Sequence, residues 1–468
     1  MKTDEERWAK EEFGSVDLGD ERRTRRLVSM AARAARAPAG RVLQVFEGSA
    51  ERQGAYDLLR NSACSARAMT EAIGAATARR ASAHAKVFVS IDGSSLSLTD
   101  RTGRKGFGGV GSTKNKGRGL KVITAYALDA SGTPLGVLDQ QWWARPPSRK
   151  RHDCHSRKVA EKETQYWVGS IEASCDRLAA HAPDTRVWYL LDRESDRRHH
   201  LEALRETGAT YVVRSCYNRR LSEDLPRYLV DELSAVAPRY SYALDVKAGP
   251  GRSARKAHLA VRIVRVQLRL RDKQSGDVQP FEVDVVEARE EGTCPSGEKP
   301  IAWRLLTNHR VETAEDAREV IEAYAKRWAI ELFHKTWKTG ACNVEDSQLR
   351  DREHVIKWAT LMAAVAARIE RLKNLSRSEP DLPADRELSK YELLALITLK
   401  RRTKKRTETI PDDVPTLAQA IWWMAELGGY TGKSSGGPPG AITIQRGFVK
   451  VAAAAAAIRE LDRMGKLR

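Results

Sequence analysis

The sequence predicts an α/β protein in which a mixed sheet lies between a helical N-terminal domain and a helical C-terminal domain. Apolar residues recur at helical spacing in about the first 80 residues. Short apolar runs then alternate with helical patterns as far as residue 307, and helical periodicity returns beyond residue 313. The 468 residues exceed what one hydrophobic core usually holds. We therefore expect domains at 1–80, 81–375 and 376–468.

The charge balance of the chain indicates a polyanion as partner. There are 81 Lys and Arg against 62 Asp and Glu, a formal net charge of +19, which favours nucleic acid over a membrane surface. The longest apolar runs, 358–367 and 451–458, are too short to span a bilayer, and no secretory signal precedes them. Six cysteines without a C-x-x-C pair suit reduced thiols. We expect a cytoplasmic protein with no membrane partner.

The N-terminal domain is predicted to be helical and basic. Asp20 can cap a helix that begins at Glu21, with Leu27 and Met30 on its apolar stripe. Seven basic and two acidic residues lie between positions 20 and 41. A solvated helix face would also explain them, but the net charge favours contact with phosphates. The candidate DNA-binding residues here are Arg22, Arg23 and Arg26.

The central domain begins with strands. An antiparallel meander is expected first, then a helix, and then a strand, a helix and a strand, an order typical of a ribonuclease H-like sheet. The expected strands are 87–92, 120–128, 136–143, 186–191 and 210–213, and the expected helices are 158–178 and about 196–206.

A change to period-two patterning predicts a β-rich insertion at about 217–300, where Val264, Val266, Leu268 and Leu270 alternate with polar residues. A short strand and mainly helical segments should follow. We expect a strand at 303–307, one long helix from about 313 to 337, a helix at 353–373, a linker at 376–385, a helix at 388–399 and a helical tail interrupted at 432–440.

Basic loops are further candidates for DNA contact. The segment 106–111 satisfies G-x-G-x-x-G, but it leads into another strand and opens no helix, so a dinucleotide site is disfavoured. The surrounding 101–121 has seven basic and no acidic residues, and we expect Lys114 and Lys116 to lie along a phosphate backbone. The cluster 152–155 (HDCH) lies in another basic run and lacks a second ligand pair, which disfavours a metal site there.

Three acids are the candidate catalytic residues. Asp92 and Asp192 each follow an apolar strand, and Glu331 lies in the predicted long helix. An exposed helix with i,i+4 ion pairs, and ordinary acids at strand ends, would also fit this pattern. Three converging carboxylates, however, can bind two Mg²⁺ ions about 3.5–4 Å apart, the arrangement that cuts phosphodiesters.

The spacing Tyr324-x₂-Arg327-x₃-Glu331-x₆-Lys338 matches the motif of DDE transposases of the insertion-sequence-four family, and the chain resembles their Tn-five type. SIDGSSLSL around Asp92 and LLDRESD around Asp192 resemble the two aspartate segments of that family. Further counterparts, among them QWWARP, YVVRS and LGDERRTRRL, extend the resemblance from about Trp8 to residue 430.

The resemblance implies a role for each candidate residue. Asp92, Asp192 and Glu331 would bind two Mg²⁺, for which Mn²⁺ substitutes. DNA contacts would come from Tyr324, Arg327, Lys335, Lys338 and Arg214, and from Trp303, which would stack on a flipped base; a core tryptophan is the alternative for Trp303. The sequence departs from the family after Arg214, where SCYN replaces a more basic run, and in its C-terminal tail.

The implied function is that of a bacterial cut-and-paste transposase acting as a homodimer in a synaptic complex on double-stranded DNA, both transposon end repeats and target. It would excise the element by hydrolysis and hairpin formation and join the 3′ ends to target DNA. The helical C-terminal domain would serve dimerisation. The alternatives are a catalytically silent DNA-binding transposition inhibitor and a ribonuclease H-like nuclease without strand transfer.

Overall fold

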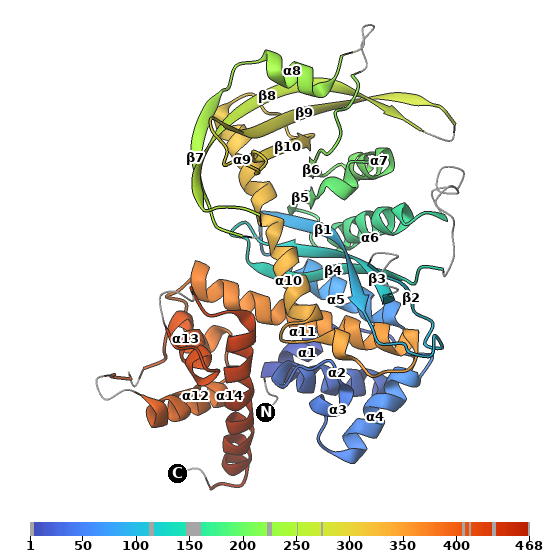
Figure 1. The fold of residues 1–468 in the computed structure, drawn as a ribbon. Coiled ribbons are helices and arrows are strands. Elements are labelled where there is room, and N and C mark those ends of the chain that lie inside the picture. The colour runs from blue at the N-terminus through green and yellow to red at the C-terminus, as the bar shows by residue number, and fades with distance from the viewer. Residues whose placement is uncertain are drawn as a thin grey trace.

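A computed structural model describes residues 4–111, 117–146, 161–221, 227–249, 251–272, 275–404, 408–410, 413–432 and 437–466. Figure 1 shows a sheet through the upper and middle parts of the molecule, helices of the N-terminal region below it, and the C-terminal helices beside them. Lys114, Lys116 and the segment 152–155 lie outside the described residues.

The N-terminal region is helical, as predicted. Asp20 accepts a hydrogen bond from the backbone N–H of Arg22 (2.8 Å) and so caps the second helix, on which Leu27 and Met30 are buried. The helices are α1 (Asp4–Phe13), α2 (Glu21–Arg36), α3 (Val42–Val45), α4 (Ser49–Arg60) and α5 (Ala66–Ala81).

A ten-stranded mixed sheet forms the centre, in the order β2-β3-β1-β5-β6-β10-β9-β8-β7, with β4 paired to β3. The predicted antiparallel meander is present in the β1–β3 and β3–β4 pairs, and β1, β5 and β6 are parallel. The first strands are β1 (Lys86–Ser97), β2 (Gly108–Gly109), β3 (Arg118–Leu128), β4 (Pro134–Trp143), β5 (Arg186–Leu191) and β6 (Thr210–Arg214), with helices α6 (Thr164–His181) and α7 (Arg198–Glu206) between them.

The predicted β-rich insertion extends this sheet. Its strands β7 (Tyr240–Val246), β8 (Arg255–Arg271) and β9 (Val278–Glu291) join the core through β10 (Ala302–Thr307), which pairs with both β9 and β6. Helix α8 (Leu229–Ala235) packs on β8. The insertion is therefore continuous with the core sheet.

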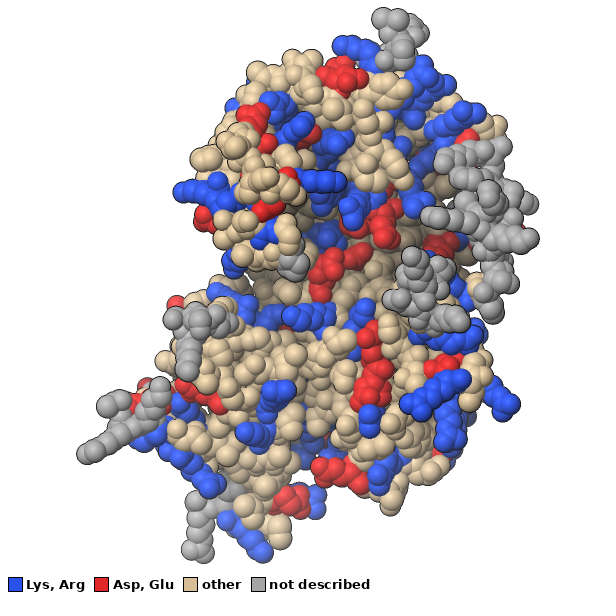
Figure 2. Space-filling model, in the orientation of Figure 1, with Lys and Arg blue, Asp and Glu red and all other residues tan. Residues whose placement is uncertain are grey.

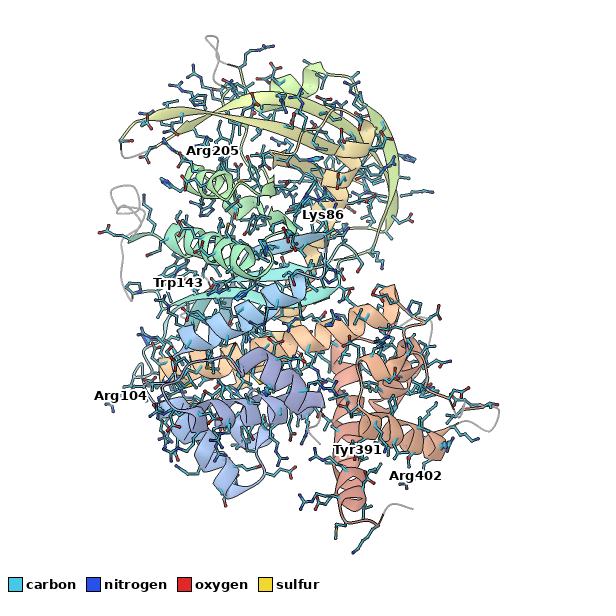
Figure 3. All side chains as sticks on the ribbon, turned by 180° about the vertical axis from the view of Figure 1, so that it is seen from behind. Lys86, Arg104, Trp143, Arg205, Tyr391 and Arg402 are labelled. Carbon is cyan, nitrogen blue, oxygen red and sulfur yellow. The ribbon has the colours of Figure 1, made fainter. Side chains whose placement is uncertain are left out.

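Two layers of helices cover the sheet. Apolar residues of β1 alternate between its faces: Phe88 contributes to a core shared with the N-terminal helices, and Val89 and Ile91 to a core with α6 and α7. Figure 3, seen from behind, shows Trp143 at the end of β4 next to α6, where its ring stacks on that of Tyr166 (4.2 Å between centroids).

The predicted single helix over about 313–337 is wrong in one respect, because it is interrupted. Helix α9 (Ala314–Lys326) ends at Arg327 and α10 (Trp328–Lys338) begins after it. At this point Arg327 N–H donates to the Tyr324 carbonyl and Ile330 N–H to the Arg327 carbonyl, so i→i+3 bonds replace the α-helical pattern. The break falls at Arg327, the residue that contacts two of the acids.

The C-terminal part is helical. Helix α11 (Arg352–Ser378) is longer than the predicted 353–373 and continues through the expected boundary at 375, because Leu372 and Leu375 stay buried against the last helices. Short 3₁₀ segments are η4 (Arg193–Ser195), η5 (Val344–Asp346) and η6 (Ala384–Arg386), and the remaining helices are α12 (Lys390–Thr403), α13 (Leu417–Leu427) and α14 (Ala441–Arg463).

Helix α14 contains the apolar run 451–458 and, over its full 23 residues, is long and apolar enough to cross a membrane by composition. It packs against α12 and α13, and the Tyr391 hydroxyl on α12 (Figure 3) donates to Asp462 (2.6 Å). One such helix is weak evidence for a membrane span, since a core helix meets the same criterion.

Candidate active site

The two aspartates lie side by side on neighbouring parallel strands. β1 and β5 are paired up to Ile91↔Leu191, so Asp92 and Asp192 follow at the same level. The expectation that Asp92 ends its strand is wrong, because β1 continues to Ser97 in its pairing with β3. Asp92 therefore lies where β5 leaves β1, and Asp192 caps η4 by accepting from the Glu194 N–H (2.7 Å).

Glu331 reaches the same place from α10, and one arginine links it to Asp92. The Arg327 Nη1 lies 3.3 Å from Asp92 Oδ2, and its Nη2 lies 3.4 Å from Glu331 Oε1. The Arg327 side chain is 11% exposed, whereas that of Glu331 is 40% exposed. Figure 2 shows acidic side chains gathered across the middle of this face, at the level of β1 and α10, with Lys and Arg around them.

Negative charges repel one another at this site. The pKa of Asp92 is raised to about 7: burial is the largest cause, Arg327 lowers it, and the charges of Asp192 and Glu331 also raise it. Burial acts to lower the pKa of Arg327, but Tyr324 and the three carboxylates outweigh it and raise that pKa. The three acids therefore lie within electrostatic reach of one another and of a single guanidinium.

The donor set suits a divalent cation. Carboxylate oxygens are the ligands that Mg²⁺ and Mn²⁺ prefer, and a bound cation would relieve the repulsion that raises the pKa of Asp92. Within the described part of the chain, no three His, Cys, Asp or Glu side chains are grouped closely enough to hold a metal ion as placed. Arg327 instead provides the counter-charge to Asp92 and Glu331.

The other residues of the spaced motif have different environments. Tyr324 is buried, and Arg327 lies 5.9 Å from the centroid of its ring. Lys335 is exposed, whereas Lys338 Nζ lies 3.8 Å from Glu345 Oε1. Tyr324 is therefore buried beside the acids, whereas Lys335 on α10 is exposed.

Arg214 and Trp303 lie on the insertion side of the acids. Arg214, at the end of β6, donates to the Ala302 carbonyl (3.2 Å) and lowers the pKa of Tyr324, although burial raises that pKa overall. Trp303 on β10 is half-buried and meets the Tyr324 ring edge-on at 5.7 Å. The structure therefore brings together Asp92, Asp192, Glu331, Arg327, Tyr324, Arg214 and Trp303.

The predicted N-terminal arginines belong to a separate surface on α2. Arg22 and Arg26 are exposed, and Arg22 is paired with Asp20 at 3.1 Å. Arg23 is half-buried and donates to the Leu18 carbonyl (2.7 Å), so part of its charge is used within the fold. These three residues are not assembled with the acids.

Sequence reasoning missed Asp196 and the segment that it binds. Asp196 is fully buried four residues after Asp192, and it accepts hydrogen bonds from Ser215, Cys216, Tyr217 and Arg219. The available signal was the second Asp of LLDRESD. No local spacing rule indicates its partners, because they lie about 20 residues further along the chain.

Two family models match this chain. Residues 5–64 match the model described as Transposase DNA-binding, and residues 168–367 match the model described as Transposase DDE domain. The second match contains Asp192 and Glu331, and Asp92 lies before it. Together the matches support a DNA transposase with a DNA-binding N-terminal region, and the DDE domain implies a ribonuclease H-like core.

Proposed function

We propose that this DDE-type DNA transposase works by the cut-and-paste route, as its resemblance to the insertion-sequence-four family and the Tn-five type implies. The observation that carries the proposal is the convergence of Asp92, Asp192 and Glu331 on Arg327, at the sheet edge of a chain that matches DNA-binding and DDE models. Excision, hairpin formation and joining of the 3′ ends to target DNA would share this one site.

Asp92, Asp192 and Glu331 would hold two Mg²⁺ ions, with Mn²⁺ as a substitute. The ions would help to ionise a water or a 3′-hydroxyl and would stabilise the leaving oxygen of the phosphodiester. The raised pKa of Asp92 supports this assignment, because a carboxyl that is poorly neutralised by the protein has the most to gain from a cation. Glu331, whose side chain is 40% exposed, has room to turn from Arg327 toward that cation.

The cations beside the acids would hold the DNA. Arg327 would transfer its hydrogen bonds from Asp92 and Glu331 to a phosphate, since a guanidinium binds phosphate with two parallel N–H groups. Arg214 and Tyr324 would contact phosphates near the cleaved end, and the exposed Lys335 with Lys338 would extend that contact along α10. Trp303 would stack on a base flipped out during hairpin formation.

The proposed partners follow from the same assignment. Arg22, Arg23 and Arg26 on α2, with Lys114 and Lys116, would bind double-stranded DNA at the transposon end repeats, and a homodimer would pair two ends. The helices α12, α13 and α14 would provide the dimer contact. We place the protein in the bacterial cytoplasm, associated with the nucleoid through DNA.

The test is cleavage of a DNA substrate carrying the inverted repeats that flank this gene, with Mg²⁺ or Mn²⁺. The wild type should release excised ends and join pre-cleaved 3′ ends to a target plasmid. Asp92→Asn should lower the cleavage rate by at least about 10³, as loss of one member of a catalytic unit does. Asp139→Asn is the matched control, because Asp139 is also a buried acid of this sheet with a raised pKa but is paired with Arg177 at 2.8 Å.

Each alternative function gives a different result. Tight binding to the repeats without metal-dependent cleavage would indicate a silent DNA-binding inhibitor. Cleavage without joining of pre-cleaved ends would indicate a nuclease. Asp92→Asn cleaving as fast as Asp139→Asn would overturn the assignment of the site.

A further inference from the structure

The segment that follows β6 is fixed by a buried carboxylate. Asp196 accepts hydrogen bonds from the Ser215 hydroxyl (3.0 Å), the Cys216 N–H (2.9 Å) and Arg219 Nε (2.7 Å). The Tyr217 N–H also donates to the Asp196 carboxylate (3.3 Å), and Arg219 Nη2 donates to the backbone carbonyl of Asp196 (2.6 Å). A carboxylate that is 0% exposed and takes four donors defines the path of this backbone closely.

This segment lies beside the loop that carries Asp192. β5 and β6 are paired up to Leu191↔Val213, so Asp192 and Arg214 each follow the last paired residue on adjacent strands. Asp196 then bridges the two loops that continue from those strands. Tyr217 is therefore anchored three residues beyond Arg214, on the same edge as the candidate catalytic acids.

The Tyr217 side chain is left in solvent although its backbone is held. Its exposed fraction is 51%, and the Arg219 guanidinium lies 5.4 Å from the ring centroid. Arg193 and Arg197, on the other loop, are exposed as well. An anchored aromatic ring among arginines is the combination that binds nucleic acid, because the cations hold phosphates and the ring offers a face to a base.

We infer that the ring of Tyr217 stacks on a nucleobase of the DNA held at Asp92, Asp192 and Glu331, and that Asp196 is the positioning residue for that ring. The inference rests on the proposed function. It concerns a position where this chain carries an aromatic residue within SCYN in place of the more basic run of the family that it resembles.

The experiment uses the full chain carrying Asp92→Asn, so that DNA is bound but not cut. A duplex of the inverted repeat that flanks the gene carries 2-aminopurine at successive positions around the scissile bond. One position should change its fluorescence on binding, and Tyr217→Leu should abolish that change and weaken binding about tenfold, as loss of one stacked base does. Tyr217→Phe should restore both, because the ring and not the hydroxyl makes the contact.

Tyr228→Leu is the matched control. Tyr228 is 41% exposed and precedes α8 in the insertion, so its loss should leave both readouts unchanged. If Tyr217→Leu binds as tightly as the wild type and keeps every 2-aminopurine signal, the inference is overturned. If the unmodified protein does not bind the repeat at all, the proposed function fails instead, which separates the two outcomes.

A double-mutant cycle that measures the same 2-aminopurine fluorescence change tests the role of Asp196. Asp196→Asn should reduce the Tyr217-dependent fluorescence change, and adding Tyr217→Leu should cause no further loss of affinity. Arg219→Gln tests the same anchor if Asp196→Asn proves unstable, since it leaves the carboxylate with its backbone donors. A full wild-type signal in a folded Arg219→Gln or Asp196→Asn variant would overturn the positioning role.

Discussion

Two carboxylates of this protein have similar solvent exposure but opposite electrostatics. Glu290, in the insertion, is 7% exposed, and Asp92, in the core sheet, is 8% exposed. Glu290 receives two hydrogen bonds from Arg255 (2.7 and 2.9 Å) and one from the Ile301 N–H (2.9 Å), and the Arg255 bonds lower its pKa to about 2. Asp92 shares one arginine with Glu331 at longer distances, and its pKa is about 7.

The difference separates a structural acid from a candidate catalytic one. An acid whose acceptor sites are filled by its own arginine stabilises the fold, and few of its lone pairs remain free to bind a ligand. An acid that is buried with too little positive charge can be stabilised further by a cation. The predictions below test whether this electrostatic difference marks the active site.

Among the variants considered below, the largest effect is expected at Arg327. Arg327→Gln should slow cleavage of the end DNA about 10²-fold, because it removes the guanidinium that would hold the phosphate beside the acids. Arg327→Lys should fall between this variant and the wild type, since an ammonium cannot make the paired contact. Single-turnover cleavage rates measure both.

The matched control is Arg318→Gln on α9, whose guanidinium lies 5.5 Å from the Tyr240 ring and away from the acids. Near-wild-type cleavage is expected for it. An equal loss in the two glutamine variants would mean that the effect comes from damage to the helices.

A medium effect is expected at Glu392, another buried acid with a raised pKa. That pKa is raised to about 7: burial and the charge of Glu5 raise it, and Arg368 and the hydrogen bonds from Ser389 oppose the change. Arg36 faces the same pair from α2, 3.4 Å from Glu5. Because the pKa is raised on folding, the contribution of Glu392 to stability is full below about 4.5 and is lost as pH rises toward about 7.

Glu392→Gln should therefore flatten the fall in the free energy of unfolding over this window, by up to about 1.4 kcal/mol per pH unit. Urea denaturation from pH 4.5 to 8 gives the comparison. DNA cleavage should persist, because Glu392 lies in the capping box of α12 and not beside Asp92. An unchanged pH slope in the variant would show that Glu392 does not titrate in this range.

The smallest effect on DNA cleavage at neutral pH is expected for substitution of Glu290. Its lowered pKa means that its stabilising contribution is present above about 4.5 and is lost as pH falls toward about 2. Glu290→Gln should lower the thermal midpoint at pH 7 and lower it less at pH 3, with cleavage retained. A midpoint lowered equally at both pH values would contradict the pairing with Arg255.

Local sequence patterns predicted the fold well where the cause of structure is local. The Asp20 cap and the apolar stripe of α2 are present, as are the alternation of β8 and the strand order of the core. The break at Arg327 was not predicted, because the same residues have unbroken helical periodicity in the sequence. The continuation of β1 past Asp92 was also missed, since it depends on pairing with β3.

For the candidate site, the sequence by itself determined which residue types are available: two acids after apolar strands, a third on a helix, and cations at helical spacing around it. The tertiary structure decided which of them meet. Arg327 approaches Asp92 across 235 positions of sequence, and Asp196 holds the segment of Tyr217 across 21. Neither contact can be inferred from spacing, because it is the pairing of β1, β5 and β6, and the turn between α9 and α10, that set those distances.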